Sequence, residues 1–362
     1  MLVRFLFILL LLFAAYVAHA FSNPFPTSKS GSQIKPSYGF TYIFDDAVWY
    51  GLDTRASLIK LLDEFDFQWV RLPFFWDQMT DENGNLKLDD LIFAISEAQK
   101  RDVKVVIALG AKTPSYPEFH WPEKIASRVK FGETIGANHP IATDILEIDR
   151  KVVEQLAQFD NISHWQIENE PFLANINNIK IDKSLIAAEV RAVRTADSKR
   201  RPIILSHVGP ATIDGRWRLL LDLLQPGDVL AVNAYFKTQG VYLLSFSLSG
   251  NRIDIRWPRW FTFPSQSWLF LSPNYKSIKE EVESKNIDFW VLEMQAEPYI
   301  RSLEDAKRSE FPFTAEDLAK ADLLLRTRGV ETIGFWGVHF WQYRESIGDK
   351  SWIRAVKEIV NR

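Results

Sequence analysis

The chain has 362 residues, a formal charge of −3 from 43 Lys and Arg against 46 Asp and Glu, and no cysteine. This length gives one large domain or two ordinary ones, and the near-neutral balance excludes a basic nucleic-acid surface and general disorder. The lack of cysteine excludes disulfides, thiolate zinc sites, iron–sulfur clusters and cysteine nucleophiles. The 13 Trp, 10 Tyr and 26 Phe residues are unusually many, and exposed rings in a cleft suit flat ligands such as sugars.

Residues 1–20 have the pattern of a secretory signal peptide. Arg4 precedes an apolar run from Phe5 to Ala18, and Ala18-His19-Ala20 fits a small-x-small cleavage site. The run of about 14 residues is shorter than the roughly 20 that cross a membrane, although an uncleaved signal anchor remains the alternative. Residues 21–36 are rich in Ser, Pro, Asn and Lys, which predicts a flexible leader. We expect export to the periplasm or the extracellular space.

Residues 37–362 are predicted to form one domain in which short apolar strands alternate with helices eight times. Strands that are apolar along their whole length are typical of sheets buried on both faces. Eight strand-helix pairs predict an α/β fold of the (β/α)8 TIM-barrel type. A doubly wound open sheet usually has fewer units and a glycine-rich first turn, and no Gly-x-Gly-x-x-Gly occurs here. The expected strands are Tyr38–Ile43, Trp69–Leu72, Lys104–Leu109, Ile162–Ile167, Ile203–Ser206, Val229–Ala234, Phe289–Leu292 and Thr332–Trp336. The expected helices are Leu52–Phe65, Leu88–Lys100, Ala142–Phe159, Leu185–Ala196, Arg216–Leu224, Tyr275–Glu283, Ala315–Arg328 and Trp352–Val360.

Two connections that follow predicted strands are long. Thr113–Ile141 follows the third strand and Phe236–Ser272 follows the sixth. In a barrel both would lie at the C-terminal face, where active sites form. We expect most aromatic rings of the second insertion to pack it against the barrel and a few to line a cleft. These rings belong to Tyr242, Phe246, Trp257, Trp260, Phe261, Phe263, Trp268 and Phe270.

Two glutamates lie at strand ends on opposite sides of the predicted barrel mouth. Glu170 follows the fourth strand within Asn169-Glu170-Pro171, and Glu293 follows the apolar residues of the seventh. Two facing carboxyl groups are what glycoside hydrolysis needs, since one protonates the leaving oxygen while the other attacks or activates water. Their surroundings must separate their pKa values. For either glutamate alone, an ion pair or a position beside a helix N-cap is the purely structural alternative.

Asn169-Glu170-Pro171 after an apolar strand, combined with Glu293, resembles the signature of the large clan of retaining glycoside hydrolases with TIM barrels. That clan includes many cellulases, mannanases and β-galactosidases, and the resemblance covers the second to the eighth predicted strand. It implies that Glu170 is the general acid/base and that Glu293 is the nucleophile.

The same resemblance implies roles for further residues. Asn169 would bind the sugar 2-hydroxyl, Arg71 would order the nucleophile, and Tyr235 would supply an aromatic hydroxyl. The platform tryptophan under the sugar would be Trp341 or, fitting less well, Trp336. His207 is a candidate for the histidine that usually lies near these groups, and is equally consistent with a structural donor.

Two other glutamates compete with the expected pair. The clan often has an aromatic residue and a glycine after the nucleophile, whereas Glu293 is followed by Met-Gln-Ala-Glu-Pro, so Glu297 is a second nucleophile candidate. We favour Glu293, because Glu297 lies beyond the predicted strand and precedes a proline. Glu168 lies two residues before Glu170, and strand alternation would point it inward, deeper in the barrel.

Other classes of barrel fit less well. A non-catalytic carbohydrate-binding barrel is the alternative, and the presence of both carboxylates disfavours it. A metal-dependent hydrolase is disfavoured because the six histidines show no i,i+4 pair and no ligand cluster. No phosphate-binding loop and no Gly-x-Ser-x-Gly elbow occur. We therefore expect no cofactor and no metal, a carbohydrate substrate, no nucleic acid, and no obligate protein partner.

Overall fold

The computed structural model describes residues 11–12, 14–15, 18, 25, 35–173, 176–209, 214–239, 242–248, 251–256, 262–264 and 273–361. The predicted signal peptide and leader therefore fall almost wholly outside the described residues. Within the described part of the chain, no helix is both long enough and apolar enough to cross a membrane.

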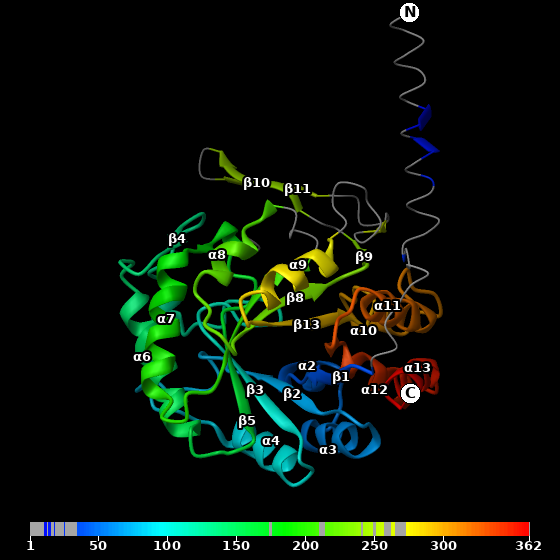
Figure 1. The fold of residues 1–362 in the computed structure, drawn as a ribbon, viewed down its shortest axis with the longest axis horizontal. Helices are drawn as coiled ribbons and strands as arrows, with labels where there is room; N and C mark the ends of the chain where they lie inside the picture. The colour runs from blue at the N-terminus through cyan, green and yellow to red at the C-terminus, as the bar shows by residue number, and fades with distance from the viewer. Residues whose placement is uncertain are drawn as a thin grey trace, which may run out of the picture.

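Eight parallel strands close into a barrel in the order β1-β14-β13-β8-β7-β5-β3-β2, and helices surround it (Figure 1). This confirms the predicted (β/α)8 TIM barrel. Each expected strand is present, and the largest difference is the seventh, which extends three residues further at its C-terminal end. The barrel strands are β1 (Ser37–Thr41), β2 (Trp69–Pro73), β3 (Lys104–Leu109), β5 (Ile162–Ile167), β7 (Ile203–Val208), β8 (Val229–Ala234), β13 (Asp288–Gln295) and β14 (Thr332–Trp336).

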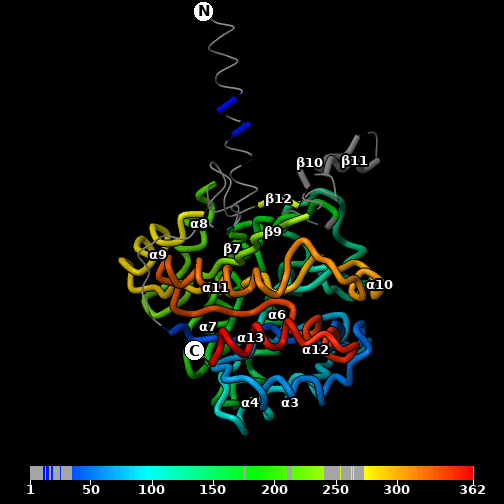
Figure 2. The backbone as a smooth tube through the Cα atoms, turned by 90° about the vertical axis from the view of Figure 1, so that its right-hand side faces the viewer, coloured from blue at the N-terminus to red at the C-terminus, as the bar shows by residue number. Residues whose placement is uncertain are grey.

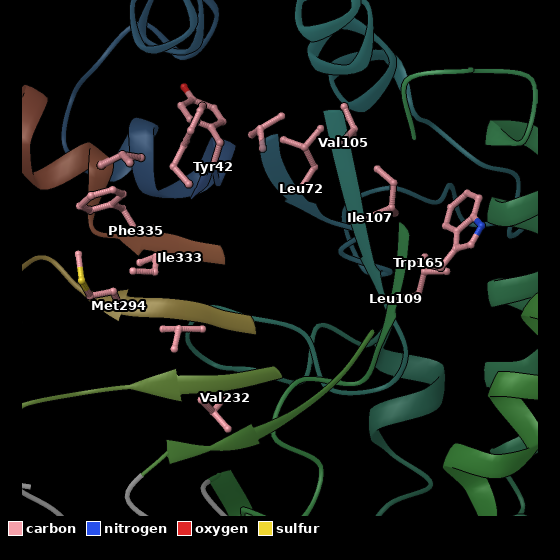
Figure 3. Packing of buried hydrophobic residues seen from close by; sticks show 14 of the residues in the cluster. Tyr42, Leu72, Val105, Ile107, Leu109, Trp165, Val232, Met294, Ile333 and Phe335 are labelled. Atoms are coloured by element: carbon pink, nitrogen blue, oxygen red, sulfur yellow. The ribbon is translucent and has the colours of Figure 1, made fainter. Parts of the chain in front are cut away.

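Apolar side chains form two separate layers, because successive side chains of a strand point to opposite faces. The outer layer fills the space between strands and helices, and Figure 3 shows part of it, including Ile107, Trp165 and Phe335. The inner layer is small and fills the barrel itself. It consists of Trp69, Val106, Ile204, Val229, Ala231 and Leu292, with Trp290 packed against it. Side chains can therefore be assigned to the inside or the outside of the barrel strand by strand.

The helices follow the strands as expected, with ends that differ by a few residues. On one side of the barrel α11 and α12 pack against α13 (Figure 2). Four helices were not predicted, namely α2 after β1, α12 directly after β14, and the short helices α5 and α10 in the connections that follow β3 and β13. The helices are α2 (Phe44–Trp49), α3 (Thr54–Glu64), α4 (Asp89–Gln99), α5 (Glu123–Ala126), α6 (Ala142–Leu156), α7 (Lys183–Ala196), α8 (Trp217–Leu221), α9 (Tyr275–Glu283), α10 (Leu303–Ala306), α11 (Ala315–Thr327), α12 (Val338–Ser346) and α13 (Ser351–Val360).

The insertion after β8 contains four further strands. An antiparallel hairpin pairs β10 (Tyr242–Leu248) with β11 (Asn251–Arg256), and β9 (Lys237–Thr238) pairs with β12 (Phe263–Pro264). The aromatic residues at 257, 260, 261, 268 and 270 lie outside the described residues. The prediction that a few rings of the insertion line the cleft therefore stays a prediction.

Trp69 fills the barrel interior between two glycines. A Cβ added at Gly39 of β1 would lie 2.1 Å from Trp69 Cδ2, and one added at Gly334 of β14 would lie 2.5 Å from Trp69 Cη2. Only glycine leaves room for the indole at these two positions. The ring in turn supports the polar layer above it.

We expect Gly39→Ala to lower the free energy of unfolding by about 1–3 kcal/mol, because the nearest atoms to the new methyl group all belong to Trp69. In a Trp69→Leu background the same substitution should lower the free energy of unfolding much less. Urea unfolding of the unmodified protein, the two single variants and the double variant would measure this difference. Gly51→Ala is the control, since Gly51 has a φ of +70° and no heavy atom within 4 Å of the added Cβ. Its cost should be equal in both backgrounds. Equal costs for Gly39→Ala would contradict the packing argument.

Candidate active site

The C-terminal ends of the strands carry a connected polar network centred on Arg71. Arg71 lies at the end of β2 and is fully buried. Its guanidinium donates from Nη1 to Glu293 Oε1 at 2.6 Å, from Nε to Gln166 Oε1 at 2.7 Å and from Nη2 to Asn169 Oδ1 at 2.9 Å. Three predicted site residues are thus brought together with Gln166, which sequence analysis did not identify.

A β-bulge turns Glu293 into the barrel. Leu292 belongs to the inner apolar layer, so strict alternation would point Glu293 outward. The register of β13 against β8 shifts between Val291 and Glu293, which inserts one residue and lets Glu293 face inward as well. Its second carboxylate oxygen accepts a hydrogen bond from the Tyr235 hydroxyl at 2.9 Å. Both oxygens of Glu293 therefore receive donors from the barrel.

Glu170 lies across the mouth on the turn after β5. The Asn233 side-chain amide donates to Glu170 Oε1 at 2.9 Å, and the Ser206 hydroxyl accepts from the Glu170 backbone N–H at 3.2 Å. Burial and the negative charge of Glu293 raise the pKa of Glu170 to about 8, although Lys112 opposes the shift. Glu170 is therefore protonated at neutral pH while Glu293 is paired with Arg71. The two carboxyl groups thus have different partners, an amide for Glu170 and a guanidinium for Glu293.

The side-chain oxygen of Asn169 accepts from several groups at once. Besides Arg71, the Ser206 hydroxyl lies 3.3 Å away, and the amides of Gln166 and Asn233 each lie 3.4 Å away. This surrounding of donors fixes which end of the Asn169 side chain is the oxygen. The orientation leaves its amide NH2 on the side opposite these donors.

Three polar residues of this network were missed by sequence analysis. Gln166, Ser206 and Asn233 each lie in the C-terminal half of a barrel strand, namely β5, β7 and β8. Each follows an inward-facing position by two residues, so each points into the barrel. A polar residue at an inward position of a buried strand is a signal that could have identified them.

Two residues predicted for the site lie elsewhere. Trp341 is on α12, not at a strand end, and is fully buried with its indole N–H bonded to the Ala296 carbonyl at 2.6 Å. The expectation that it stacks under a sugar is therefore wrong. His207 points to the outer face of β7, opposite Ser206, where it packs edge-on to Phe172 and its Nε2 lies 3.6 Å from Asp214 Oδ1.

Glu168 does not point into the barrel as alternation suggested. It has a φ of 57°, in the left-handed region, so the strand geometry ends before it. Its carboxylate accepts from the backbone N–H groups of Ala111 and Lys112, each at 2.8 Å, on the side of helices α6 and α7. Alternation failed here because it applies only while the backbone remains extended.

A cavity of about 170 Å³ opens at the ends of β1 and β14. Thr41 lines it and also lies 3.4 Å from Arg71, so the cavity adjoins the polar network. Trp336 lines it too, as the half-buried last residue of β14. The other lining residues are Ile43, Asp46, Trp49, Tyr50, Ser115, Tyr116, Glu297, Gly337 and His339. Aromatic rings thus form much of the wall, and no lysine or arginine is among these residues.

Glu297 faces this cavity instead of Arg71. Its carboxyl group is hydrogen-bonded to the side chains of Trp336 and Tyr50, and removal from water together with the charge of Asp46 raises the pKa of Glu297 to about 8. Burial likewise raises the pKa of Asp46 to about 7. Arg71 therefore pairs with Glu293, whereas Glu297 lies on the cavity wall. No group of three His, Asp or Glu residues in the described part of the chain is arranged to hold a metal ion.

Solved glycoside hydrolases share this fold at low sequence identity. A lichenase from Caldicellulosiruptor sp. F32 is 14% identical, with a TM-score of 0.56. The match covers 92% of this chain and 98% of the lichenase chain. An exo-β-1,4-mannosidase, Op5Man5 from Opitutaceae bacterium strain TAV5, is 15% identical with a TM-score of 0.56, covering 93% and 62%. A β-galactosidase from the psychrophilic Marinomonas ef1 is 12% identical with a TM-score of 0.52, covering 88% and 61%. The chain thus spans less than two thirds of the latter two proteins.

Sequence comparison assigns the family. No curated protein sequence matches the chain significantly. The model of the cellulase family, glycosyl hydrolase family 5, matches residues 25–223, which is more than half of the 362 residues. This confirms the resemblance to the clan of TIM-barrel glycoside hydrolases. The chain belongs to glycosyl hydrolase family 5, and its barrel is a glycoside hydrolase domain.

Proposed function

We propose that the protein cleaves O-glycosidic bonds of an oligo- or polysaccharide by a retaining double displacement. The observation that carries this proposal is the contrast between two buried carboxyl groups across one barrel mouth. Glu293 is paired with Arg71 and accepts from Tyr235, whereas Glu170 is neutral at pH 7 and bonded to Asn233. One group is suited to attack and the other to donate a proton.

In the first step Glu293 attacks the anomeric carbon while Glu170 gives its proton to the departing oxygen. The bond to the leaving group breaks as the bond from the Glu293 carboxylate to the sugar forms. Ester formation removes the negative charge that raises the pKa of Glu170. Glu170 can then act as base, taking a proton from water as the water oxygen attacks the sugar and releases Glu293.

The surrounding groups support these two steps. Arg71 and Tyr235 hold both oxygens of Glu293, which fixes the carboxylate for attack. Burial and the charge of Glu293 raise the pKa of Tyr235 well above its usual value. Its hydroxyl therefore stays protonated and can donate a hydrogen bond to Glu293. Asn169, with its oxygen held by Arg71, would donate from its amide to the sugar 2-hydroxyl, a hydrogen bond that strengthens as the ring flattens.

The cavity beside the network would hold part of the carbohydrate. Trp336 is suited to stack on an apolar sugar face, in place of Trp341. Asp46 and Glu297 would bind sugar hydroxyls from the cavity wall. The signal pattern of residues 1–20 supports export of the enzyme, and N-terminal sequencing of the processed protein, with Phe21 as the expected first residue, would test this.

We expect Glu293→Ala to lower kcat on an activated aryl glycoside by on the order of 10⁴-fold or more, because the nucleophile is lost. Added azide or formate should restore part of the turnover by taking its place. Glu170→Ala should spare the first step for good leaving groups, which need no proton, and slow the second. The matched variant Glu297→Ala should keep the nucleophile and raise KM instead.

Proton NMR of the first-formed sugar provides the stereochemical check. Retention is expected, and an inverted product would exclude a covalent intermediate on Glu293. Loss of turnover in Glu297→Ala together with full activity in Glu293→Ala would assign the nucleophile to Glu297.

The pH profile should report the protonation of Glu170. Since the free enzyme needs protonated Glu170, kcat/KM should fall as the pH rises through about 8. Asn233 donates to the carboxylate and lowers the pKa of Glu170. Asn233→Ala should therefore move the alkaline limb to higher pH. An alkaline limb that stays in place in this variant would assign the limb to another group.

Substitutions of Trp336 and Trp341 should have different effects on kinetics and on stability. Trp336→Ala should lower kcat/KM for an oligosaccharide by about tenfold or more, because a stacking surface is removed. Trp341→Phe should lower Tm while leaving kcat/KM within about twofold, since Trp341 is core. The reverse pattern would restore Trp341 as the platform. Steady-state kinetics and thermal unfolding of both variants decide this.

A further inference from the structure

Three fully buried carboxyl groups lie directly behind the turn that carries Glu170. We call them the carboxyl triad: Asp149 on α6, Glu168 on the turn after β5 and Glu189 on α7. The Glu189 carboxyl group interacts with those of both Asp149 and Glu168. None of the three takes part in the mechanism derived above. Buried carboxyl groups are costly, so their presence at this position calls for a physical account.

Several oxygens of the triad lack a donor from any other side chain or backbone group that the structure describes. Within the described part of the chain, no N–H or O–H group donates to Asp149 Oδ2 or to either carboxyl oxygen of Glu189. Two carboxyl groups can bond to each other only if one carries a proton. Burial and the neighbouring carboxyl groups raise the pKa of Asp149 and of Glu189 well above their usual values. The cation that faces Glu168 is Lys112, which in turn lies 3.4 Å from Glu118.

Glu168 ties two catalytic-face turns together. Its two carboxylate oxygens accept from the consecutive backbone N–H groups of Ala111 and Lys112, which follow β3. A Cβ at Gly110 would lie 2.9 Å from the Glu168 carboxyl carbon, so only glycine lets the turn approach this closely. The bonds continue along the backbone, with Asn169 N–H donating to the Lys112 carbonyl at 2.7 Å.

The same contacts fix the backbone of Glu170. Lys112 Nζ donates to the Glu170 carbonyl at 2.9 Å and to the Leu173 carbonyl at 3.0 Å. Glu168 and Glu170 both have left-handed backbones, with φ of 57° and 50°. Side chains rarely adopt this conformation without support from neighbours. The direction of the Glu170 side chain thus depends on the segment that Glu168 anchors, although the two carboxyl groups face opposite sides.

We propose that Glu168, held by Asp149 and Glu189, is a positioning residue that aims Glu170 for proton transfer. The proposal rests on the proposed function of Glu170. The carboxylate of Glu168 has two acceptor oxygens, one for each backbone N–H. A glutamine at position 168 has only one, and its NH2 group, which is a donor, would face the other backbone N–H. The segment that carries Glu170 would then lose one of its two anchoring bonds. Proton donation to the leaving group should suffer, while attack by Glu293 should not.

The test is the dependence of kcat/KM on leaving-group acidity. The probes are aryl glycosides, from dinitrophenyl to phenyl, of the sugar that the unmodified enzyme cleaves fastest. In Glu168→Gln, cleavage of the phenyl glycoside should fall about 100-fold, and cleavage of the dinitrophenyl glycoside less than about threefold. The slope against leaving-group pKa should therefore steepen, as it should in Glu170→Ala. A general loss of folded protein would instead lower the apparent kcat/KM for all substrates equally.

Asp322→Asn is the matched control. Asp322 is also a fully buried carboxylate, but it lies on α11 and accepts from Tyr38 and Arg326. This variant should lower Tm and leave the slope unchanged. If Glu168→Gln does not fold, Glu168→Asp takes its place, because its carboxylate is one methylene shorter and cannot reach both N–H groups. If the folded Glu168→Gln or Glu168→Asp enzyme shows the same slope of kcat/KM against leaving-group pKa as the unmodified enzyme, the proposal is overturned.

A second measurement tests whether Glu189 carries a proton in the folded protein. Raised pKa values mean that the folded chain keeps protons that the unfolded chain releases above about pH 4.5, so stability falls as the pH rises from there. The amide of Glu189→Gln can donate to Asp149 and Glu168 without titrating. Tm should then fall less between pH 5 and 8 than in the unmodified enzyme, with the slope of leaving-group dependence unchanged. An identical fall in Tm would overturn the shared-proton arrangement.

The outcomes separate the two proposals. If the unmodified enzyme cleaves no glycoside, the proposed function fails and this inference fails with it. If the unmodified enzyme is active and Glu168→Gln keeps its slope, the inference alone is overturned.

Discussion

A buried guanidinium, that of Arg71, is the constraint on which the barrel mouth depends. A charge without exposed surface must be paired and fully hydrogen-bonded, since an uncompensated buried charge costs about 3–5 kcal/mol. Glu293 supplies the opposite charge, and Gln166 and Asn169 accept the remaining bonds. Each partner is oriented by the interaction that satisfies Arg71. The hydrogen bonds of Arg71 therefore connect the polar side chains of the barrel mouth into one network.

Departures from regular backbone geometry aim the two proposed catalytic residues. The bulge in β13 turns Glu293 inward beside Leu292, and the left-handed residue at 170 turns the chain away from β5. A left-handed non-glycine residue costs about 1–2 kcal/mol, so it persists only where the surroundings hold it. Here the surroundings are the inner apolar layer around Trp69 below and the hydrogen bonds between the turns after β3 and β5.

Acidic side chains at this face lie in different surroundings, and burial raises the pKa of several of them. Glu293 faces Arg71, while Glu170 faces the neutral amide of Asn233 and keeps its proton at pH 7. The cavity acids, Asp46 and Glu297, also have raised pKa values, and no lysine or arginine lines their cavity. Under the proposed function, carboxyl groups of one barrel would thus serve attack, proton donation, substrate binding and turn positioning.

Sequence alone determined the barrel and the order of its parts, because eight short apolar strands buried on both faces leave few other architectures. It also singled out Arg71, Glu170 and Glu293, through polar residues at strand ends and the resemblance that they carry. Only the tertiary structure decided which way side chains point where the backbone stops alternating. The bulge at Glu293 and the left-handed turn at Glu168 depend on contacts with distant strands, and no local pattern encodes them. Trp341 shows the same limit, since it was expected near a strand end but lies in the core on a helix whose register is set by packing.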